Sequence, residues 1–227
     1  MSEWWSELSS YRPSDFLMFA PRIYWRLFES INVAVWPAQL LLVGAALAWV
    51  GWFMRRGAEA APRASAVALA LCWLFVAWAF LLQRYAPINW AADAFALGFA
   101  LQGLGLLALV GCGPLQACVQ PWRRAAGLGL LLWALLGHPL LALLSRRPWT
   151  QAEVFGLAPD PTAIGTLGWL LWLQGRRDSA RWLLRVLWLV PVAWCAISAA
   201  TLATMGEWPA LVPLAAALLA LTAARRR

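Results

Sequence analysis

An aspartate and a threonine stand at the start of an apolar stretch, in the order Ala158-Pro159-Asp160-Pro161-Thr162. In a structural interpretation, Asp160 caps a helix whose first position is Pro161. In a functional interpretation, a short helix ahead of this point and the helix after it form a broken element within a membrane. Irregular backbone at depth is tolerated only where protein or water covers it, so Asp160 and Thr162 would then face a polar cavity that binds substrate.

A second pair of polar residues, Asn89 and Asp93, stands at the start of another apolar stretch. Asn89 caps that helix and Asp93 lies in its first turn, where a carboxylate complements the helix dipole. Alternatively, Asp93 is a buried ionisable group, which costs roughly 2.5 to 3.5 kcal/mol at the centre of a bilayer. We include both residues in the candidate substrate-binding set.

His138 is the single histidine of the chain and lies toward the end of an apolar stretch. One histidine excludes haem ligation by two histidines and helical two-histidine zinc motifs within a single chain. The imidazole can still take part in binding a solute or an ion. His138 therefore completes the candidate substrate-binding set.

Arginines near these acidic residues are expected to act as their charge partners. Arg84 precedes Asp93 closely, and Arg146 and Arg147 precede Asp160. A buried carboxylate needs such a partner, because an isolated charge away from water is strongly unfavourable. We expect Arg84 to pair with Asp93, and Arg146 or Arg147 to pair with Asp160.

Thr150 and Glu153 have the spacing of a capping box, in which each side chain bonds the backbone N–H of the other residue. Gly156 would then end the short helix that this box begins. This interpretation gives Glu153 a local structural role.

Signatures of catalysis and of cofactor binding do not occur in the sequence. Lysine is absent, which excludes retinal bound as a Schiff base and the phosphate-loop lysine. No serine stands in a G-x-S-x-G elbow, and no H-E-x-x-H pair occurs. The five residues between Cys112 and Cys118 match no common zinc spacing. We assign no catalytic residue, metal or cofactor, and a non-enzymatic function is favoured.

Composition indicates that lipid surrounds most of this chain. Hydrophobic residues make up 63% and charged residues 12% of the 227 positions, against roughly 45 to 50% and about 25% in soluble domains. The formal charge of +8 does not point to nucleic acid, because the arginines stand at the ends of apolar stretches, as in membrane proteins. Membrane lipids are therefore the expected surroundings.

The fold class expected is all-α, an integral membrane bundle of seven transmembrane helices. About 20 apolar residues cross the hydrocarbon core once. The last span is short, so six spans with a terminal hairpin remain an alternative. The expected spans are Val33–Met54, Ala64–Leu82, Ala91–Gly111, Ala125–Leu144, Pro161–Gly175, Trp182–Thr204 and Pro209–Ala224.

Arginine placement orients the bundle. Most arginines follow the odd-numbered spans, and the positive-inside rule puts those ends in the cytoplasm. The pair at 146–147 after the fourth span counts against this orientation. We expect a bacterial cytoplasmic (inner) membrane, with the N-terminus outside and the C-terminus cytoplasmic. The expected regions are an extracytoplasmic segment 1–32, a bundle 33–224 and a basic tail 225–227.

The segment before the first span is predicted to form an interfacial amphipathic helix beginning at Pro21. Arg22, Arg26 and Glu29 recur every three or four residues, with apolar side chains between them. The alternative is an N-terminal extension of the first span.

Small residues at helical spacing predict where helices approach closely. Such pairs occur in three spans, as Gly44 with Ala48, Ala94 with Gly98, and Ala196 with Ala200. Many of the 18 tryptophans fall at span ends, where they suit the headgroup region, and the indole N–H groups of the deeper ones need partners.

Several motifs resemble those of a family of uncharacterised bacterial multi-pass membrane proteins, known as a domain of unknown function. The resemblance spans most of the chain and implies an inner-membrane location with no assigned activity. It is carried by Tyr11-Arg12-Pro13-Ser14-Asp15-Phe16, Pro21-Arg22 with Tyr24, Leu27-Phe28-Glu29, Trp36-Pro37, Arg84-Tyr85-Ala86-Pro87-Ile88-Asn89-Trp90-Ala91-Ala92, and Ala158-Pro159-Asp160-Pro161-Thr162 with Gly165-Thr166.

Three functions are compatible with these features. The leading hypothesis is a permease-like transporter of a small solute or ion, whose outer cavity gathers Asp93, Asp160, Thr162 and His138. A structural or regulatory subunit that docks a partner membrane protein is the second. An intramembrane enzyme acting on a lipid or quinone, with Asp160 as acid or base, is the third.

Overall fold

The structure is a computed structural model that describes residues 19–56 and 62–226. The chain is mostly helical within these ranges, with one pair of three-residue strands, which confirms the predicted all-α class. Its elements are α2 (Pro21–Ala34), α3 (Ala38–Arg56), α4 (Pro62–Phe75), η3 (Val76–Tyr85), α5 (Ala92–Gly111), β1 (Leu115–Ala117), α6 (Pro121–Leu132), η4 (Trp133–Gly137), α7 (His138–Leu144), η5 (Trp149–Gln151), α8 (Pro159–Leu171), β2 (Leu173–Gly175), α9 (Asp178–Val186), α10 (Leu189–Thr204), η6 (Trp208–Ala210) and α11 (Leu211–Arg225).

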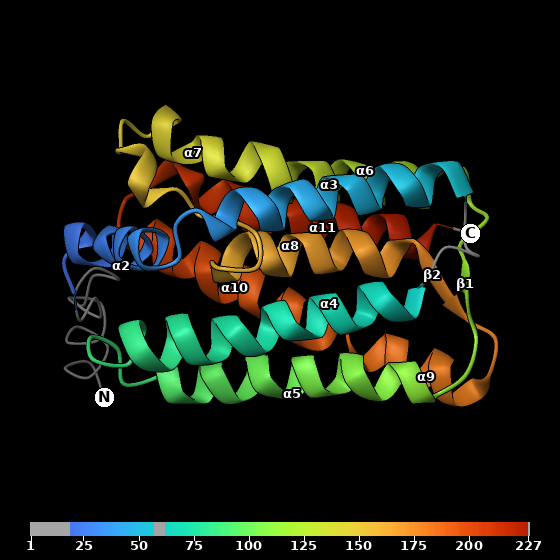
Figure 1. Cartoon of the computed structure of the whole chain (residues 1–227). Helices are drawn as coiled ribbons and strands as arrows, with labels where there is room; N and C mark the ends of the chain where they lie inside the picture. Colours follow the sequence, from blue (N-terminus) through green and yellow to red (C-terminus); the bar gives the residue numbers. More distant parts are fainter. Residues whose placement is uncertain (1–18, 57–61, 227) are drawn as a thin grey trace, which may run out of the picture.

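The long helices lie side by side and run between two ends of one bundle (Figure 1). We call one of them the α2 end, because α2 and the connection from α7 to α8 lie there. The other is the strand end, where β1 and β2 pair antiparallel with Gln116 opposite Gln174. The first 18 residues, including the Tyr11–Phe16 motif, and Arg227 of the tail lie outside the described residues.

Six helices of the described residues are long and apolar enough to cross a membrane. The predicted fifth span is not among them: α8 has 13 residues, which is about 20 Å of helix. The helix too short for a span is therefore α8, whereas the sequence suggested that the seventh predicted span is the short one. The six are Ala38–Arg55, Pro62–Tyr85, Ala92–Gly111, Pro121–Leu144, Asp178–Thr204 and Trp208–Arg225.

Helix α8 is the centre of the bundle, and every one of its residues is buried. It packs against α4, α6, α10 and α11. Gly127 of α6 and Gly168 of α8 permit the close approach of these two helices, since a Cβ on either would lie 2.7 Å from the other's carbonyl oxygen. Trp73 of α4 donates its indole N–H to Thr166 Oγ1 at 2.8 Å, and Trp169 of α8 donates to Ser65 Oγ of α4 at 2.9 Å.

Helix α2 begins at Pro21, as predicted, and is separate from α3. Its aromatic residues Tyr24, Trp25 and Phe28 are buried in the protein core, where the rings of Phe28 and Phe80 lie 4.8 Å apart. The apolar face of this amphipathic helix therefore covers the α2 end of the bundle. The aromatic side chains of this face have partners in η3, and the interfacial position of the helix stays a prediction.

The small-residue pairs do not mark helix contacts. A Cβ added at Gly44 or Gly98 would meet no atom within 4 Å, and Ala196 and Ala200 are exposed. These faces point outward together with large apolar side chains such as Leu97, which is 62% exposed. Spacing alone does not say which face of a helix meets a neighbour, and the pattern was misleading here.

Candidate cation site at the entrance of helix α8

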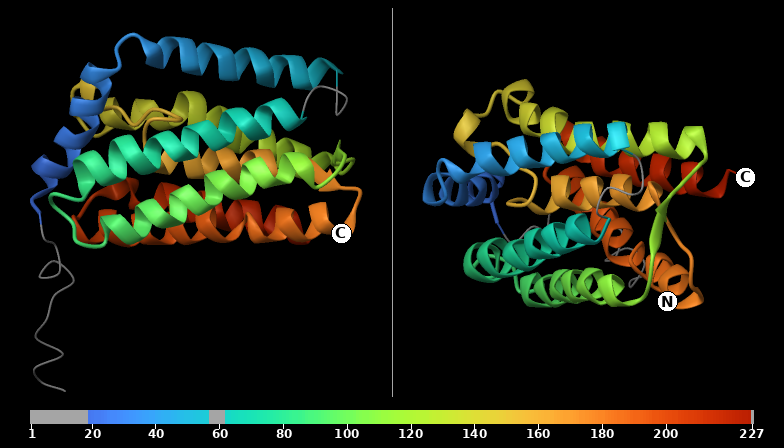
Figure 2. Two further views of the ribbon diagram at one scale, coloured as in Figure 1. Left: turned by 60° about the horizontal axis from the view of Figure 1, so that its bottom comes forward. Right: turned by 45° about the vertical axis from the view of Figure 1, so that its right-hand side comes forward.

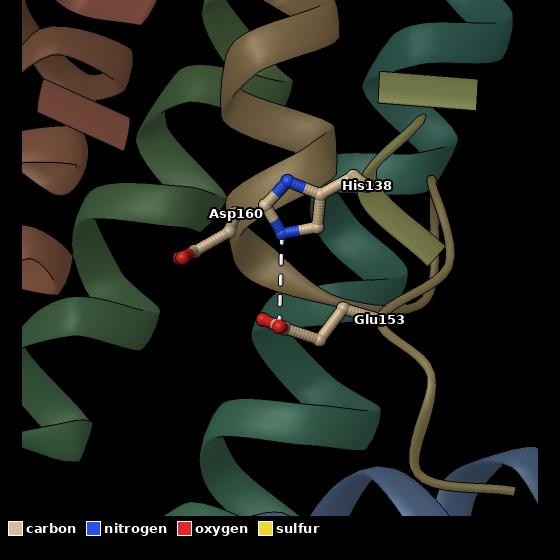
Figure 3. Close-up of side chains that lie close together, drawn as sticks. All are labelled: His138, Glu153 and Asp160. Carbon is tan, nitrogen blue, oxygen red and sulfur yellow. Dashed lines mark ion pairs between the residues drawn. The ribbon is translucent and has the colours of Figure 1, made fainter. Parts of the chain in front are cut away.

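Three titratable side chains from three segments converge at the α2 end of the bundle (Figure 3). His138 begins α7, Glu153 belongs to the irregular connection before α8, and Asp160 lies in the first turn of α8. Their side chains are buried, with exposed fractions of 1%, 4% and 1%. Burial of three such groups in one place needs a physical explanation, because charged groups are rarely buried unless they are paired.

A π-helical turn positions His138. The helix from Pro121 to Leu144 widens at η4, and the backbone N–H of His138 bonds the carbonyl of Trp133, five residues earlier. Pro139 explains the widening, because proline lacks an N–H and its ring clashes with the carbonyl four residues before it. Short π-turns of this kind are frequent at functional sites. The turn directs the imidazole into the bundle.

The connection that carries Glu153 is buried although it is not helical. Asn32 of α2 donates from Nδ2 to the carbonyls of Thr150 and Ala152, at 2.8 and 2.7 Å. Thr162 Oγ1 accepts from the N–H of Gly156 at 2.9 Å and donates to the carbonyl of Ala158 at 2.7 Å. These bonds satisfy backbone groups that cannot pair within a helix. Glu153 is thereby fixed inside the protein.

Asp160 does not cap its helix. The helix begins at Pro159, and its N-cap residue, Ala158, makes no side-chain cap bond. The Asp160 carboxylate instead accepts hydrogen bonds from two side chains of α10, Trp194 Nε1 at 2.7 Å and Ser198 Oγ at 2.5 Å. In Figure 3 this carboxylate points away from the His138–Glu153 pair. The capping interpretation of Asp160 is therefore wrong, because partners on a distant helix hold the side chain.

Electrostatic contacts link Glu153 to both of its neighbours. His138 Nε2 lies 3.7 Å from Glu153 Oε2, and Arg147 Nη2 lies 3.9 Å from the same oxygen. Both distances are too long for hydrogen bonds. The guanidinium of Arg147 also lies over the ring of Trp25, 3.4 Å from its centroid. Arg147 is therefore held between an aromatic face and a carboxylate.

The buried charges do not balance. With both carboxylates ionised, Glu153 and Asp160 contribute two negative charges and Arg147 one positive charge, a formal sum of −1 when His138 is neutral. Both ring nitrogens of His138 lack a hydrogen-bond partner among the described residues. A buried imidazole without partners, next to excess negative charge, is where a proton or another cation would be stabilised.

A metal ion is the other species to consider, although the sequence predicted no metal site. One ligand atom from each of His138, Glu153 and Asp160 lies within 4.8 Å of the others, and all three residue types bind Zn²⁺. A divalent ion would change the net charge from −1 to +1 beside Arg147. Within these four side chains a single positive charge restores neutrality, which favours a proton. The half-buried Glu207 carboxylate, which accepts from Trp25 Nε1 at 3.4 Å, adds a further negative charge beside Arg147.

Burial also shifts the pKa values of two side chains around the cluster, Arg147 and Tyr24. Burial lowers the pKa of Arg147, while the Glu153 carboxylate raises it in opposition. Burial raises the pKa of Tyr24 well above its ordinary value, and the Asp160 and Glu153 carboxylates raise it further. Tyr24 therefore stays neutral and adds no charge to the cluster.

The residues predicted from the sequence do not all meet. The structure brings His138, Asp160 and Thr162 to one region, although Thr162 uses its hydroxyl to fasten the backbone. Asp93 is exposed in the first turn of α5. Asn89 Oδ1 accepts from the N–H of Ala91 at 2.9 Å, so it organises the turn before α5 and does not cap the helix.

The predicted charge partners also differ from the observed ones. Arg84 donates to Ser30 Oγ and to the carbonyl of Ala79, and the described residues contain no ion pair between Arg84 and Asp93. Arg147 pairs with Glu153 and not with Asp160. The half-buried Arg84 finds acceptors on α2 and on its own helix, whereas Arg147 lies beside the Glu153 carboxylate.

Glu153 is the residue of the cluster that sequence reasoning missed. The T-x-x-E spacing suggested a capping box, but the helix there, η5, has three residues and no side-chain cap bond. Its neighbours Ala152, Val154 and Phe155 are apolar and buried. A carboxylate inside an apolar run was the available signal for a buried site.

Two apolar grooves flank α3, which lies at the outer edge of the bundle (Figure 2). The larger groove, of about 620 Å³, separates α3 from η4 and α7. Its lining includes Pro139, which follows His138, and Ala152 and Val154, which flank Glu153. The sequence suggested a polar cavity at this position, whereas the groove beside the site is apolar.

A sequence model of a family of unknown function (DUF6064) matches residues 21–227. The chain belongs to this family, which confirms the resemblance to an uncharacterised domain family. Comparison with curated proteins and with solved structures gives no match.

Proposed function

We propose that this member of the DUF6064 family is a multi-pass membrane protein of the permease type, in which His138, Glu153 and Asp160 bind a proton that the protein moves across the membrane. The unpartnered, fully buried imidazole of His138 beside an unbalanced carboxylate carries the proposal. Histidine is the side chain whose charge changes most readily near neutral pH.

A membrane location is supported by the six long apolar helices and by their outward faces. Leu41, Leu97 and Leu101 are 74%, 62% and 58% exposed. Exposed apolar area on this scale is unfavourable in water and suits lipid. The irregular, buried entrance to α8 also fits a membrane protein, because non-helical backbone at depth occurs where protein covers it.

The arginine distribution supports an orientation with the strand end in the cytoplasm. Most arginines of the described residues belong to the strand end, whereas the α2 end has Arg22, Arg26, Arg84, Arg146 and Arg147. The α2 end and the proton site would then face the periplasmic side of a bacterial inner membrane. Protons would reach the site from outside.

Helix α3 is the element whose movement would admit protons to the closed site. It is the least buried of the six candidate spans, with 17% of the span buried inside the protein, and grooves border it on two sides. Asn32 near the end of α2 and Gln39 at the start of α3 each keep a buried side-chain oxygen without a partner among the described residues. Those oxygens offer acceptors beside the connection that carries Glu153.

Proton movement can be measured in liposomes that contain the full-length protein and a trapped pH-sensitive dye. A potassium diffusion potential, negative inside, should drive acidification faster than in empty liposomes. The variants Asp160→Asn and Glu153→Gln remove one negative charge each without changing side-chain size, and should lower the rate at least tenfold. Asp93→Asn removes an equivalent charge from an exposed position and should leave the rate unchanged.

Equal rates for Asp160→Asn, Glu153→Gln and the unaltered protein would contradict the proposal, as would a rate no higher than that of empty liposomes. A partner protein that co-purifies stoichiometrically, together with absent proton flux, would favour a structural or regulatory subunit instead.

A second function is favoured by the larger groove at α3. Its apolar lining and its position beside Glu153 suit an intramembrane enzyme that acts on a lipid or quinone, with the cluster as acid or base. The two functions differ in what the groove holds. A quinone or lipid that remains after mild extraction, and that Leu136→Trp displaces by filling the groove, would support the enzyme.

A further inference from the structure

A polar pocket of about 400 Å³ lies at the strand end. The His138 cluster lies at the other end of the bundle. Its charged lining consists of Arg123 from α6 and of Arg181 and Arg185 from α9, and its amide groups are those of Gln116 and Gln174. Neither the proton site nor the grooves at α3 involve these residues. The pocket therefore needs its own explanation.

The local sequence explains why the arginines point to one place. Arg181, Leu184, Arg185 and Trp188 are spaced three, four and seven residues apart, so they share one face of α9 and its extension. Gly175 lets β2 approach the start of that helix, since a Cβ there would lie 2.7 Å from the backbone nitrogen of Arg181. The strand pair thereby closes one side of the pocket.

The pocket has an excess of positive charge. Asp178 forms an ion pair with Arg181 at the exposed surface, which offsets one of the three arginines. Arg123 donates to Gln120 Oε1 at 3.4 Å, but its Nε is buried and has no hydrogen-bond partner in the part of the chain that the structure describes. Arg185 is exposed and forms no ion pair within the described ranges. Several guanidinium donors are thus available to one ligand.

We propose that this pocket binds a phosphate group, held by Arg123, Arg181 and Arg185 with the amides of Gln116 and Gln174 as further donors. Guanidinium groups match the geometry of phosphate oxygens and bind them by paired, charge-assisted hydrogen bonds. A phosphate supplies the negative charge that the pocket lacks. Its source is either the headgroup of an anionic phospholipid or a free phosphate.

The surroundings of the pocket suit a lipid headgroup. Leu170, Leu173 and Trp188 supply an apolar side to the lining, and basic pockets between helices on the cytoplasmic side bind anionic headgroups in membrane proteins. The lipid source rests on the proposed membrane location, whereas binding of a free phosphate does not. Neither depends on proton movement at His138.

Native mass spectrometry of the full-length protein can test the lipid source. The protein in detergent is given phosphatidylglycerol or phosphatidylcholine at equal concentration, and bound lipids are counted. The unaltered protein should retain phosphatidylglycerol selectively. The double variant Arg123→Gln with Arg185→Gln should bind it about 30-fold more weakly, at roughly a factor of five for each arginine.

The matched control is Arg225→Gln with Arg226→Gln, which removes the same charge from the end of α11, outside the pocket lining. It should bind phosphatidylglycerol like the unaltered protein. The variant Arg123→Lys with Arg185→Lys keeps the charge and should retain part of the affinity, which separates a folding defect from a lost ligand contact.

Inorganic phosphate distinguishes the two sources. If millimolar phosphate displaces phosphatidylglycerol and this effect depends on Arg123 and Arg185, a site for free phosphate is supported. If the lipid is retained selectively and phosphate does not displace it, the lipid headgroup is supported. Equal losses in the pocket variant and the tail variant would overturn the proposal, because only general charge would then attract the lipid. Absence of both lipid and phosphate binding would overturn it as well.

Discussion

Arginine has opposite roles at the two ends of this bundle. At the α2 end, Arg147 is 9% exposed and lies between the ring of Trp25 and the carboxylate of Glu153. At the strand end, Arg181 is 51% exposed and pairs with an aspartate that is 94% exposed. The first arginine is part of the protein interior, and the second belongs to a surface that can exchange partners.

The difference follows from the cost of dehydrating charge. Removing one member of a buried ion pair leaves the other charge without compensation, whereas water and salt screen exposed pairs. The α2 end should therefore depend on each of its charged groups. At the strand end, single substitutions should change the free energy of unfolding little and should mainly change ligand binding.

The largest expected effect is on stability at the α2 end. Arg147→Met should lower the free energy of unfolding by about 4 kcal/mol, because it leaves Glu153 buried without its cation. The neighbouring Arg146 is exposed, and Arg146→Met should change stability by less than about 0.5 kcal/mol. Denaturant unfolding of both variants in the same detergent measures the difference. Equal effects would mean that Arg147 is hydrated.

The buried connection before α8 should be the next most sensitive feature. Gly156 has φ +79°, and a Cβ there would lie 2.7 Å from Leu42 and 3.0 Å from Cys72. Gly156→Ala should destabilise by about 3 kcal/mol, from left-handed backbone strain and steric overlap.

Gly206 is the matched control for that substitution. It has φ +73°, and a Cβ there would meet no atom within 4 Å. Gly206→Ala should therefore show only the backbone strain, about 1 to 2 kcal/mol. A smaller loss for Gly156→Ala than for Gly206→Ala would contradict the tight packing of the connection.

A hydrogen bond at the centre of the bundle gives a smaller effect. Thr166→Val leaves the buried indole N–H of Trp73 without its acceptor, at a cost of about 1 to 2 kcal/mol. Thr222 is exposed, and its hydroxyl bonds only carbonyls of its own helix. Thr222→Val should be neutral within about 0.5 kcal/mol. The unfolding midpoints of the pair, measured side by side, check this prediction.

The smallest expected effect on stability is at the strand end. Arg185→Gln should change the free energy of unfolding by less than about 0.5 kcal/mol, because the side chain is exposed. The same substitution should weaken binding at the phosphate pocket. A loss as large as that of Arg147→Met would remove the proposed contrast between the two ends.

Hydrophobicity predicted most of the bundle. The predicted third span, Ala91–Gly111, coincides with α5 within one residue. A run of about 20 apolar residues is typical of one continuous helix of this kind. The role of α8 was not predictable in this way. Its 13 residues look like an ordinary short span, and only packing on all sides distinguishes them.

Sequence reasoning identified His138 and Asp160 but not how they are connected. Local motifs suggested a cap at Asp160 and a capping box at Glu153, since both patterns are defined by neighbours in the chain. The observed partners, Trp194 and Ser198 for Asp160 and Arg147 for Glu153, depend on the tertiary fold. The exposed position of Asp93 likewise depends on how α5 is rotated.

The most direct test of the proton site uses the single histidine of the chain. Labelling histidine with ¹⁵N gives an NMR spectrum of His138 alone, which reports the protonation state of both ring nitrogens. The account predicts that Glu153→Gln and Asp160→Asn change the protonation state of this ring in lipid at a fixed pH, because each removes a negative charge from its surroundings, while Asp93→Asn does not. A ring spectrum that both cluster variants leave unchanged would contradict it.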